Sequence, residues 1–110
     1  MTDQSIPAPI QTFIDATNAG DNEGFVAVFT DNAYVRDWGR EFNGHEGVAS
    51  WNRTDNIGVH MQFELISCEA TGPGPESYAL TIKATSNRFN GTGTMQITLR
   101  NNLISRLEIG

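Results

Sequence analysis

Side chains in the first half of the chain follow helical spacing. Four positions, three apolar and one threonine, recur at i, i+3, i+4 and i+7: Ile10, Phe13, Ile14 and Thr17. That spacing places one stripe of side chains against a core, so it predicts a first helix. Gly20 follows the stripe and is expected to end this helix.

A second, shorter helix is predicted directly after Gly20. Asp21 belongs to the residue types that cap helix N-termini, because its side chain accepts a backbone N–H of the first turn. The apolar side of this helix would be formed by Phe25, Val28 and Phe29. Asp31-Asn32 is typical of a turn and would end the helix.

Two short strands and a third helix complete the first half. Residues 33–37 and 40–42 are predicted to be extended, with a turn at Trp38-Gly39 between them. Residues 45–54 have two large apolar side chains three positions apart, which is typical of one face of a short helix.

The second half of the chain alternates between apolar and polar residues, which predicts β-strands. In the third predicted strand the apolar positions are Val59, Met61, Phe63 and Leu65, and the apolar phase then slips by one position between Leu65 and Ile66. Because one inserted residue restores the buried face after such a slip, we expect a β-bulge there. The later strands have three apolar sets: Tyr78, Leu80, Ile82 and Ala84, then Met95, Ile97 and Leu99, and finally Leu103, Leu107 and Ile109.

Three turn signals separate these strands. They are residues 72–75 (GPGP), Asn90-Gly91, which is the strongest short hairpin signal in the chain, and Asn101-Asn102. Helices followed by a meander of four long strands predict an α+β fold, in which helices pack on one side of a curved, mostly antiparallel sheet. A helix laid on a coiled sheet leaves a concave end, where ligands bind.

Composition and charge narrow the choice of partners. The 110 residues include 13 Asp+Glu and 7 Lys+Arg, a net charge of -6. This length suits a single domain over residues 1–110. The acidic balance argues against nucleic acid and membrane surfaces as partners, since both require an excess of Lys and Arg. No apolar run approaches the roughly 20 residues of a membrane helix, and no secretory signal is recognisable, so a cytoplasmic location is expected.

Metal and cofactor chemistry finds no support in the sequence. Cys68 is the only cysteine, which excludes an intramolecular disulfide and any multi-cysteine metal site. If His60 and Cys68 share a strand, they lie about 26 Å apart, too far for a nucleophilic pair. The two histidines also lack metal-binding spacing. We expect neither a cofactor nor a bound metal ion.

Several segments resemble the nuclear transport factor 2-like (NTF2-like) superfamily, in particular its small bacterial SnoaL-like and ketosteroid isomerase-like proteins. The segments are residues 18–21 (NAGD), 26–29 (VAVF), 31–37 (DNAYVRD), Gly44, Trp51 and residues 104–109 (ISRLEI). The resemblance covers nearly the whole chain. It implies a cone-shaped domain that encloses a pocket, but the fold alone does not decide function.

Asp37 is the position at which this resemblance implies chemistry. Ketosteroid isomerases end their first strand in a catalytic aspartate, and Asp37 falls there. A carboxylate at the mouth of an apolar cleft can move a proton to and from a carbon beside a carbonyl. The alternative for Asp37 is an exposed turn residue paired with Arg36 or Arg40.

Ketosteroid isomerases also have two residues that donate hydrogen bonds to the substrate oxygen as it becomes negative, and this sequence lacks both. Phe13 stands in place of a tyrosine on the first helix, and an apolar stretch around Ile97 replaces an aspartate on a late strand. Losing one such donor typically costs ~100-fold in rate, so standard ketosteroid isomerase chemistry is not expected. Tyr78 and the two tryptophans are the favoured replacements among six candidates: Tyr34, Tyr78, Trp38, Trp51, His60 and Arg88.

Two functions remain open. The first is a small-molecule pocket protein that binds an apolar cyclic or carbonyl-bearing ligand. If this protein is an enzyme, we expect an isomerase or cyclase that transfers protons without a cofactor and uses Asp37 as general base. Ten side chains would line its pocket: Phe13, Val35, Trp38, Trp51, Met61, Phe63, Tyr78, Leu80, Met95 and Ile97. The second is a non-catalytic ligand-binding or association module. In either case a homodimer through the polar sheet face is expected.

Overall fold

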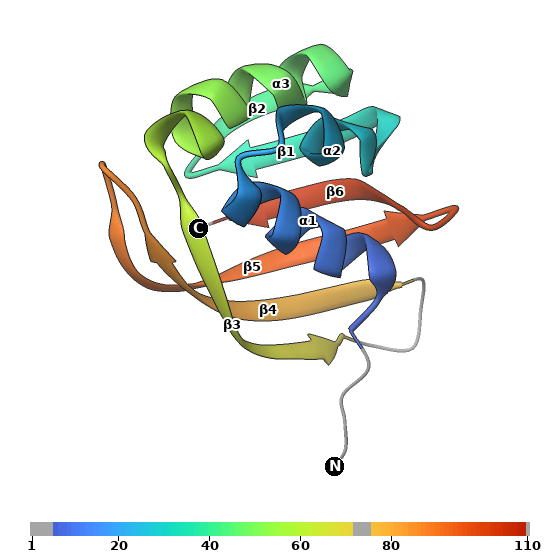
Figure 1. Ribbon diagram of the computed structural model, residues 1–110. Helices are drawn as coiled ribbons and strands as arrows, with labels where there is room; N and C mark the ends of the chain where they lie inside the picture. Colours follow the sequence, from blue (N-terminus) through green and yellow to red (C-terminus); the bar gives the residue numbers. More distant parts are fainter. Residues whose placement is uncertain (1–5, 72–75, 110) are drawn as a thin grey trace.

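The computed structural model describes residues 6–71 and 76–109, which form three α-helices on one six-stranded sheet (Figure 1). The helices are α1 (Ala8–Ala19), α2 (Asn22–Ala27) and α3 (Gly44–Asp55), followed by the short 3₁₀ helix η1 (Ile57–Val59). The strands are β1 (Phe29–Asp37), β2 (Arg40–Asn43), β3 (Gln62–Ala70), β4 (Ser77–Thr85), β5 (Asn90–Arg100) and β6 (Leu103–Ile109). None of the described helices has the length and apolar character needed to cross a membrane.

The strand order is β2-β1-β6-β5-β4-β3. Only β1 and β6 run parallel; the other neighbouring strands are antiparallel. In Figure 1, α1 crosses in front of the middle strands, while α3 lies along β1 and β2. The predicted α+β fold, with helices on a mostly antiparallel sheet, is confirmed.

Most of the local predictions in the helical half hold. The four predicted positions of α1 are buried, and Gly20 ends the helix with a φ of +71°. The Asp21 carboxylate accepts the Gly24 N–H at 3.0 Å and caps α2. The prediction for Phe29 is wrong, because α2 ends at Ala27 and Phe29 begins β1. Phe29 pairs there with Ile104 of β6, a contact between distant parts of the chain that helical spacing does not reveal.

In the sheet, the bulge and one of the turns are confirmed. The register of β3 on β4 shifts between Leu65 and Ser67. Asn101 and Asn102 form the two-residue turn between β5 and β6, with φ of +54° and +66°. The first part of the predicted third strand is instead helical, since η1 extends to Val59. The predicted turn at residues 72–75 lies outside the described residues.

The predicted hairpin turn at Asn90-Gly91 is wrong. Thr85 pairs with Asn90, so the loop is residues 86–89 and Asn90 already belongs to β5. The Ser86 hydroxyl oxygen stabilises this loop by accepting the Phe89 N–H at 2.8 Å. A short polar side chain that bonds to its own loop therefore replaces the expected Asn-Gly turn.

The core is built around a cluster of aromatic rings between the helices and the sheet. Phe13 of α1 lies 5.5 Å from both Phe25 and Phe63, measured between ring centroids. Phe25 in turn lies 6.0 Å from Trp51 of α3. Aromatic pairs at such distances stabilise a core beyond the area that they bury. Trp51 is thus held by the core on one side, and its indole N–H is directed to Asp37 on the other.

Candidate functional site

A cavity of about 510 Å³ opens at the end of the sheet where β4 turns into β5. Its walls are largely apolar and come from α3, η1 and the strands β3, β4 and β5; they include Trp51, Val59, Met61, Phe63, Ile82, Ala84 and Met95. Polar side chains are gathered in one region, at the start of β2, the end of α3 and the 86–89 loop. An apolar cavity with a few convergent polar groups is the usual form of a small-molecule site.

Asp37 brings a carboxylate to this cavity. It is the last residue of β1 and pairs with Arg40 across a two-residue turn, which places the Arg40 guanidinium beside it. Arg40 Nη2 donates to Asp37 Oδ2 at 2.9 Å, and Trp51 Nε1 donates to the same oxygen at 3.0 Å. The side chain of Asp37 is 13% exposed. The alternative of an Arg40 pair is therefore correct, but Asp37 is not an exposed turn residue.

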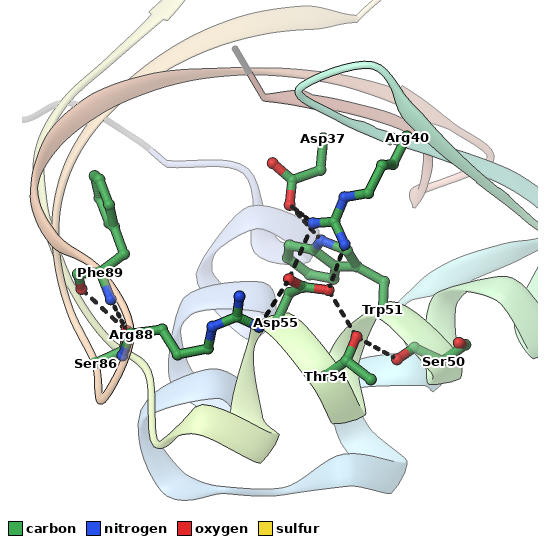
Figure 2. A network of polar contacts seen from close by, with 9 residues as sticks. All are labelled: Asp37, Arg40, Ser50, Trp51, Thr54, Asp55, Ser86, Arg88 and Phe89. Carbon is green, nitrogen blue, oxygen red and sulfur yellow. Dashed lines mark hydrogen bonds and ion pairs between the residues drawn. The ribbon is translucent and has the colours of Figure 1, made fainter.

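Only one oxygen of Asp37 is engaged by the described part of the chain. Both hydrogen bonds go to Oδ2, and no described residue donates to Oδ1. Figure 2 shows Oδ1 turned away from Arg40 and Trp51. The two donors fix the direction of the carboxyl group, and Oδ1 remains free for a ligand.

Asp55 is a second carboxylate bound by the same guanidinium (Figure 2). Arg40 Nη2 donates to Asp55 Oδ1 at 3.0 Å and Nη1 to Oδ2 at 3.3 Å, while the Thr54 hydroxyl donates to Oδ2 at 2.6 Å. Arg88 Nη1 lies 4.0 Å from Oδ1. One arginine thus bridges two carboxylates from different elements, so it fixes β2 against the end of α3.

These contacts shift the pKa of both partners. Burial by itself raises the pKa of the Asp55 carboxyl, but the hydrogen bonds from Arg40 and Thr54 more than offset it, and the pKa lies below its ordinary value. The hydrogen bond to Asp55 raises the pKa of Arg40. Both groups are therefore charged across the neutral range.

The structure brings six of the predicted site residues together at the cavity: Asp37, Trp38, Trp51, Met61, Phe63 and Met95. Their part in ligand binding remains a prediction. Four others lie in the core, where they are fully buried and outside the cavity lining: Phe13, Val35, Leu80 and Ile97. Tyr78 of β4 is half-buried and is also absent from the lining.

The six candidates to replace the missing oxyanion donors do not all lie at the cavity. Tyr34, Tyr78 and His60 do not line the cavity, whereas Trp38 and Arg88 do. Trp51 lines it too, but its indole N–H already donates to Asp37. Trp38 and Arg88 are the candidates that still offer donors at the wall. Ser86 also lines the wall, but its hydroxyl donates to the Phe89 carbonyl.

The lining residues that sequence reasoning missed include Asp55, Ser86 and Phe89. Asp55 stands four residues after Trp51, so the two share a face of α3. That spacing could have revealed it, had the third helix been extended by one residue. Ser86 and Phe89 were hidden by the misplaced turn at Asn90-Gly91. Within residues 6–71 and 76–109, no group of three metal-ligating side chains is placed to hold a metal ion.

No protein-family model matches the sequence, and no curated protein matches it significantly. Solved structures do resemble the fold. A candidate polyketide cyclase from Sinorhizobium meliloti is 22% identical over 96% of this chain and 95% of that chain, with a TM-score of 0.84. A Mycobacterium tuberculosis protein in complex with estradiol-17beta-hemisuccinate is 17% identical over 96% and 93%, with a TM-score of 0.79. An NTF2-like protein of unknown function from Cytophaga hutchinsonii is 14% identical over 100% and 93%, with a TM-score of 0.78.

These likenesses define the fold. The chain has the NTF2-like fold, as its short sequence segments indicated. At these identities the comparison does not transfer an activity to this chain, because one fold supports many functions. The function must be argued from the cavity and its carboxylate.

Proposed function

We propose that the protein binds an apolar cyclic or carbonyl-bearing small molecule in this cavity, and that Asp37 acts on it as a general base. The observation that carries the proposal is the carboxylate of Asp37, held at the wall of a largely apolar cavity by two donors on one oxygen, with no described residue donating to its other oxygen. The names of two structural neighbours, a candidate polyketide cyclase and a protein bound to a steroid ester, support this ligand class.

The chemistry is a proton transfer next to a carbonyl. Asp37 Oδ1 takes a proton from the carbon beside the carbonyl, and the C–H electron pair forms a carbon–carbon double bond as the carbonyl oxygen becomes negative. In an isomerase the proton returns at another carbon; in a cyclase the nucleophilic carbon attacks a second carbonyl. Arg88 and Trp38, at the cavity wall, are the groups that would donate to the oxyanion.

Replacing Asp37 tests the catalytic part of the proposal. The readout is deuterium uptake, measured by NMR, at the carbon beside the carbonyl of 2-tetralone in D₂O. We expect Asp37→Asn to slow the protein-dependent exchange ~100-fold or more, since a positioned base contributes about 10²–10⁴. Binding should change little, because an asparagine amide oxygen can still accept from Trp51.

The matched control is Asp31→Asn. Asp31 lies on the same strand, β1, but its side chain is fully exposed and outside the cavity. This variant should exchange at the wild-type rate. Unchanged exchange in Asp37→Asn would refute the role of Asp37 as general base.

A non-catalytic binding module is the second candidate. Phe13 favours it, because the position of the isomerase tyrosine lies in the closed core of this chain and offers the cavity no donor. Wild-type protein that binds cyclic ketones without accelerating exchange would support this alternative over the enzyme.

We also propose a homodimer through the sheet face opposite the helices. That face carries uncharged polar side chains on adjacent strands: Thr81 and Thr85 on β4, and Thr94, Gln96 and Thr98 on β5. A stable interface buries roughly 800 Å² on each partner, which a face of several strands can supply. Light scattering of the purified protein measures the oligomeric state.

We propose a cytoplasmic location as well, which cell fractionation tests.

A further inference from the structure

Two exposed aromatic side chains stand at the mouth of the cavity. Large hydrophobic residues are exposed at three places in the described chain: Trp38 is 79% exposed, Ile66 56% and Phe89 53%. Trp38 and Phe89 both line the cavity, whereas Ile66 does not. Figure 2 shows Phe89 on one side of the polar network and the turn between Asp37 and Arg40, which carries Trp38, on the other.

Trp38 is unfavourable for the turn that it occupies. The two-residue loop between Asp37 and Arg40 has φ of +51° at Trp38 and +89° at Gly39. Such a loop prefers Asn-Gly, because both residues must be left-handed, a conformation that bulky side chains rarely adopt. The other two-residue turn, Asn101-Asn102, follows this preference. Being mostly exposed, the Trp38 side chain also adds little to the core.

The backbone on both sides of the mouth is nevertheless well held. The Trp38 N–H donates to the Ile109 carbonyl at 3.0 Å. The Ser86 hydroxyl accepts the Phe89 N–H and donates to the Phe89 carbonyl at 3.0 Å. A Cβ on Gly91 would lie 3.2 Å from Phe89 Cζ, so the absence of a side chain at Gly91 makes room for the ring. The Trp38 backbone and the Phe89 ring are thus held at one opening.

We propose that Trp38 and Phe89 form an aromatic clamp that stacks on a planar, conjugated ring system of the ligand. This inference rests on the proposed small-molecule cavity and narrows its ligand class. Flat rings that stack on aromatic side chains are stabilised by more than the area that they bury. A saturated ring of similar size is stabilised only by the burial of its apolar area. A planar ligand also covers apolar surface that the free protein exposes to water.

The test uses two probes with one carbon skeleton, 2-hydroxyanthracene and perhydro-2-hydroxyanthracene, with binding measured by calorimetry. The first variant is Trp38→Asn, which removes the ring and creates the preferred Asn-Gly turn, so its Tm should equal or exceed that of the wild type. The second is Phe89→Ala. We expect each variant to bind the aromatic probe about fivefold more weakly and the saturated probe nearly as well as the wild type.

Ile66→Ala is the matched control, since it removes an exposed apolar side chain that does not line the cavity. This variant should leave both affinities unchanged. If Trp38→Asn and Phe89→Ala lose the same affinity for the saturated probe as for the aromatic probe, the clamp is overturned. It is also overturned if Trp38→Asn changes the oligomeric state and leaves both affinities unchanged. Equal binding of both probes by the wild type overturns the clamp and leaves the cavity proposal standing. The Trp38→Phe variant retains Trp51 as its single tryptophan. If calorimetry detects no binding of either probe, and the Trp51 fluorescence of this variant does not change when the probes are added, both the clamp and the cavity proposal fail.

Discussion

Arg40 is the residue on which the polar side of the cavity depends. Its guanidinium is half-exposed, yet it donates to Asp37 and to both oxygens of Asp55. Ion pairs at a surface contribute little on average, but two carboxylates that share one planar guanidinium also fix each other's position. Arg40 thereby links the chemistry at Asp37 to the stability of the fold.

Asp55→Asn should reveal this link through pH. Because the pKa of Asp55 lies below its ordinary value of 3.8 in the folded protein, its charge stabilises the fold above that value and ceases to do so as the pH falls through the folded pKa. We expect the variant to lose about 1 kcal/mol of unfolding free energy at neutral pH. The difference from the wild type should shrink as the pH falls below 3.8.

Urea denaturation across this pH range measures the difference. Asp15→Asn is a suitable control, because the one described side chain that donates to Asp15 is the neutral amide of Gln11. A gap between Asp55→Asn and the wild type that stays constant at all pH values would contradict the assigned role of the charge.

At the scale of elements, α3 sets the position of Trp51 and Asp55 relative to Asp37. The helix packs closely on β2 at Gly47, where an added Cβ would lie 2.9 Å from the Phe42 carbonyl carbon. That carbon belongs to the backbone and cannot rotate away. The distance between the two elements therefore depends on a residue without a side chain.

Gly47→Ala should accordingly destabilise the protein, although alanine in place of glycine normally stabilises a helix by about 1 kcal/mol. We expect a loss of about 1–3 kcal/mol in unfolding free energy, as for other overpacked contacts. Ser50→Ala, in the same helix, should show a small gain. Thermal unfolding of both variants checks the expectation, and a stabilised Gly47→Ala would contradict the close packing of α3 on β2.

Local signals in the sequence were sufficient for elements that depend on near neighbours. The stripe of α1, the cap at Asp21 and the Asn101-Asn102 turn were predicted because each is determined within a few residues. Phe29 was misassigned because its partner in the sheet, Ile104, is remote in the sequence. Tertiary pairing then overrides a local helical pattern.

Membership of the cavity could be predicted only in part, for a geometric reason. Leu80 and Ile82 point to the same face of β4, and alternation identifies that face correctly. Leu80 nevertheless lies in the closed core, while Ile82, one step nearer the open end, lines the cavity. How close a residue lies to the open end of the cavity depends on the coiling of the sheet. The alternation of apolar and polar residues does not encode that coiling. Asp37 was predicted because the family resemblance specifies its position.

At the scale of the whole molecule, one layer of side chains between helices and sheet serves as core at one end and as cavity wall at the other. A chain of 110 residues has a small core, so an open cavity reduces the apolar contacts that stabilise it. Stability and ligand binding should therefore oppose each other at the cavity wall.

Ala84→Leu tests this opposition. Ala84 lines the cavity on β4, and a leucine there would fill part of the empty space. We expect the unfolding free energy to rise by about 1 kcal/mol, since each buried methylene adds roughly 0.8 kcal/mol and the site is partly open. Affinity for a cyclic ketone should fall at least tenfold, because leucine and ligand compete for one volume.

Ala33→Leu is the opposite case. Ala33 is fully buried on β1 and does not line the cavity, so the same enlargement should overpack the core and cost about 1–3 kcal/mol. Chemical denaturation and calorimetry of the two variants give both quantities. If Ala84→Leu were destabilised as much as Ala33→Leu, the cavity in the unliganded protein would be closed by its own side chains, and the binding proposal would lose its structural basis.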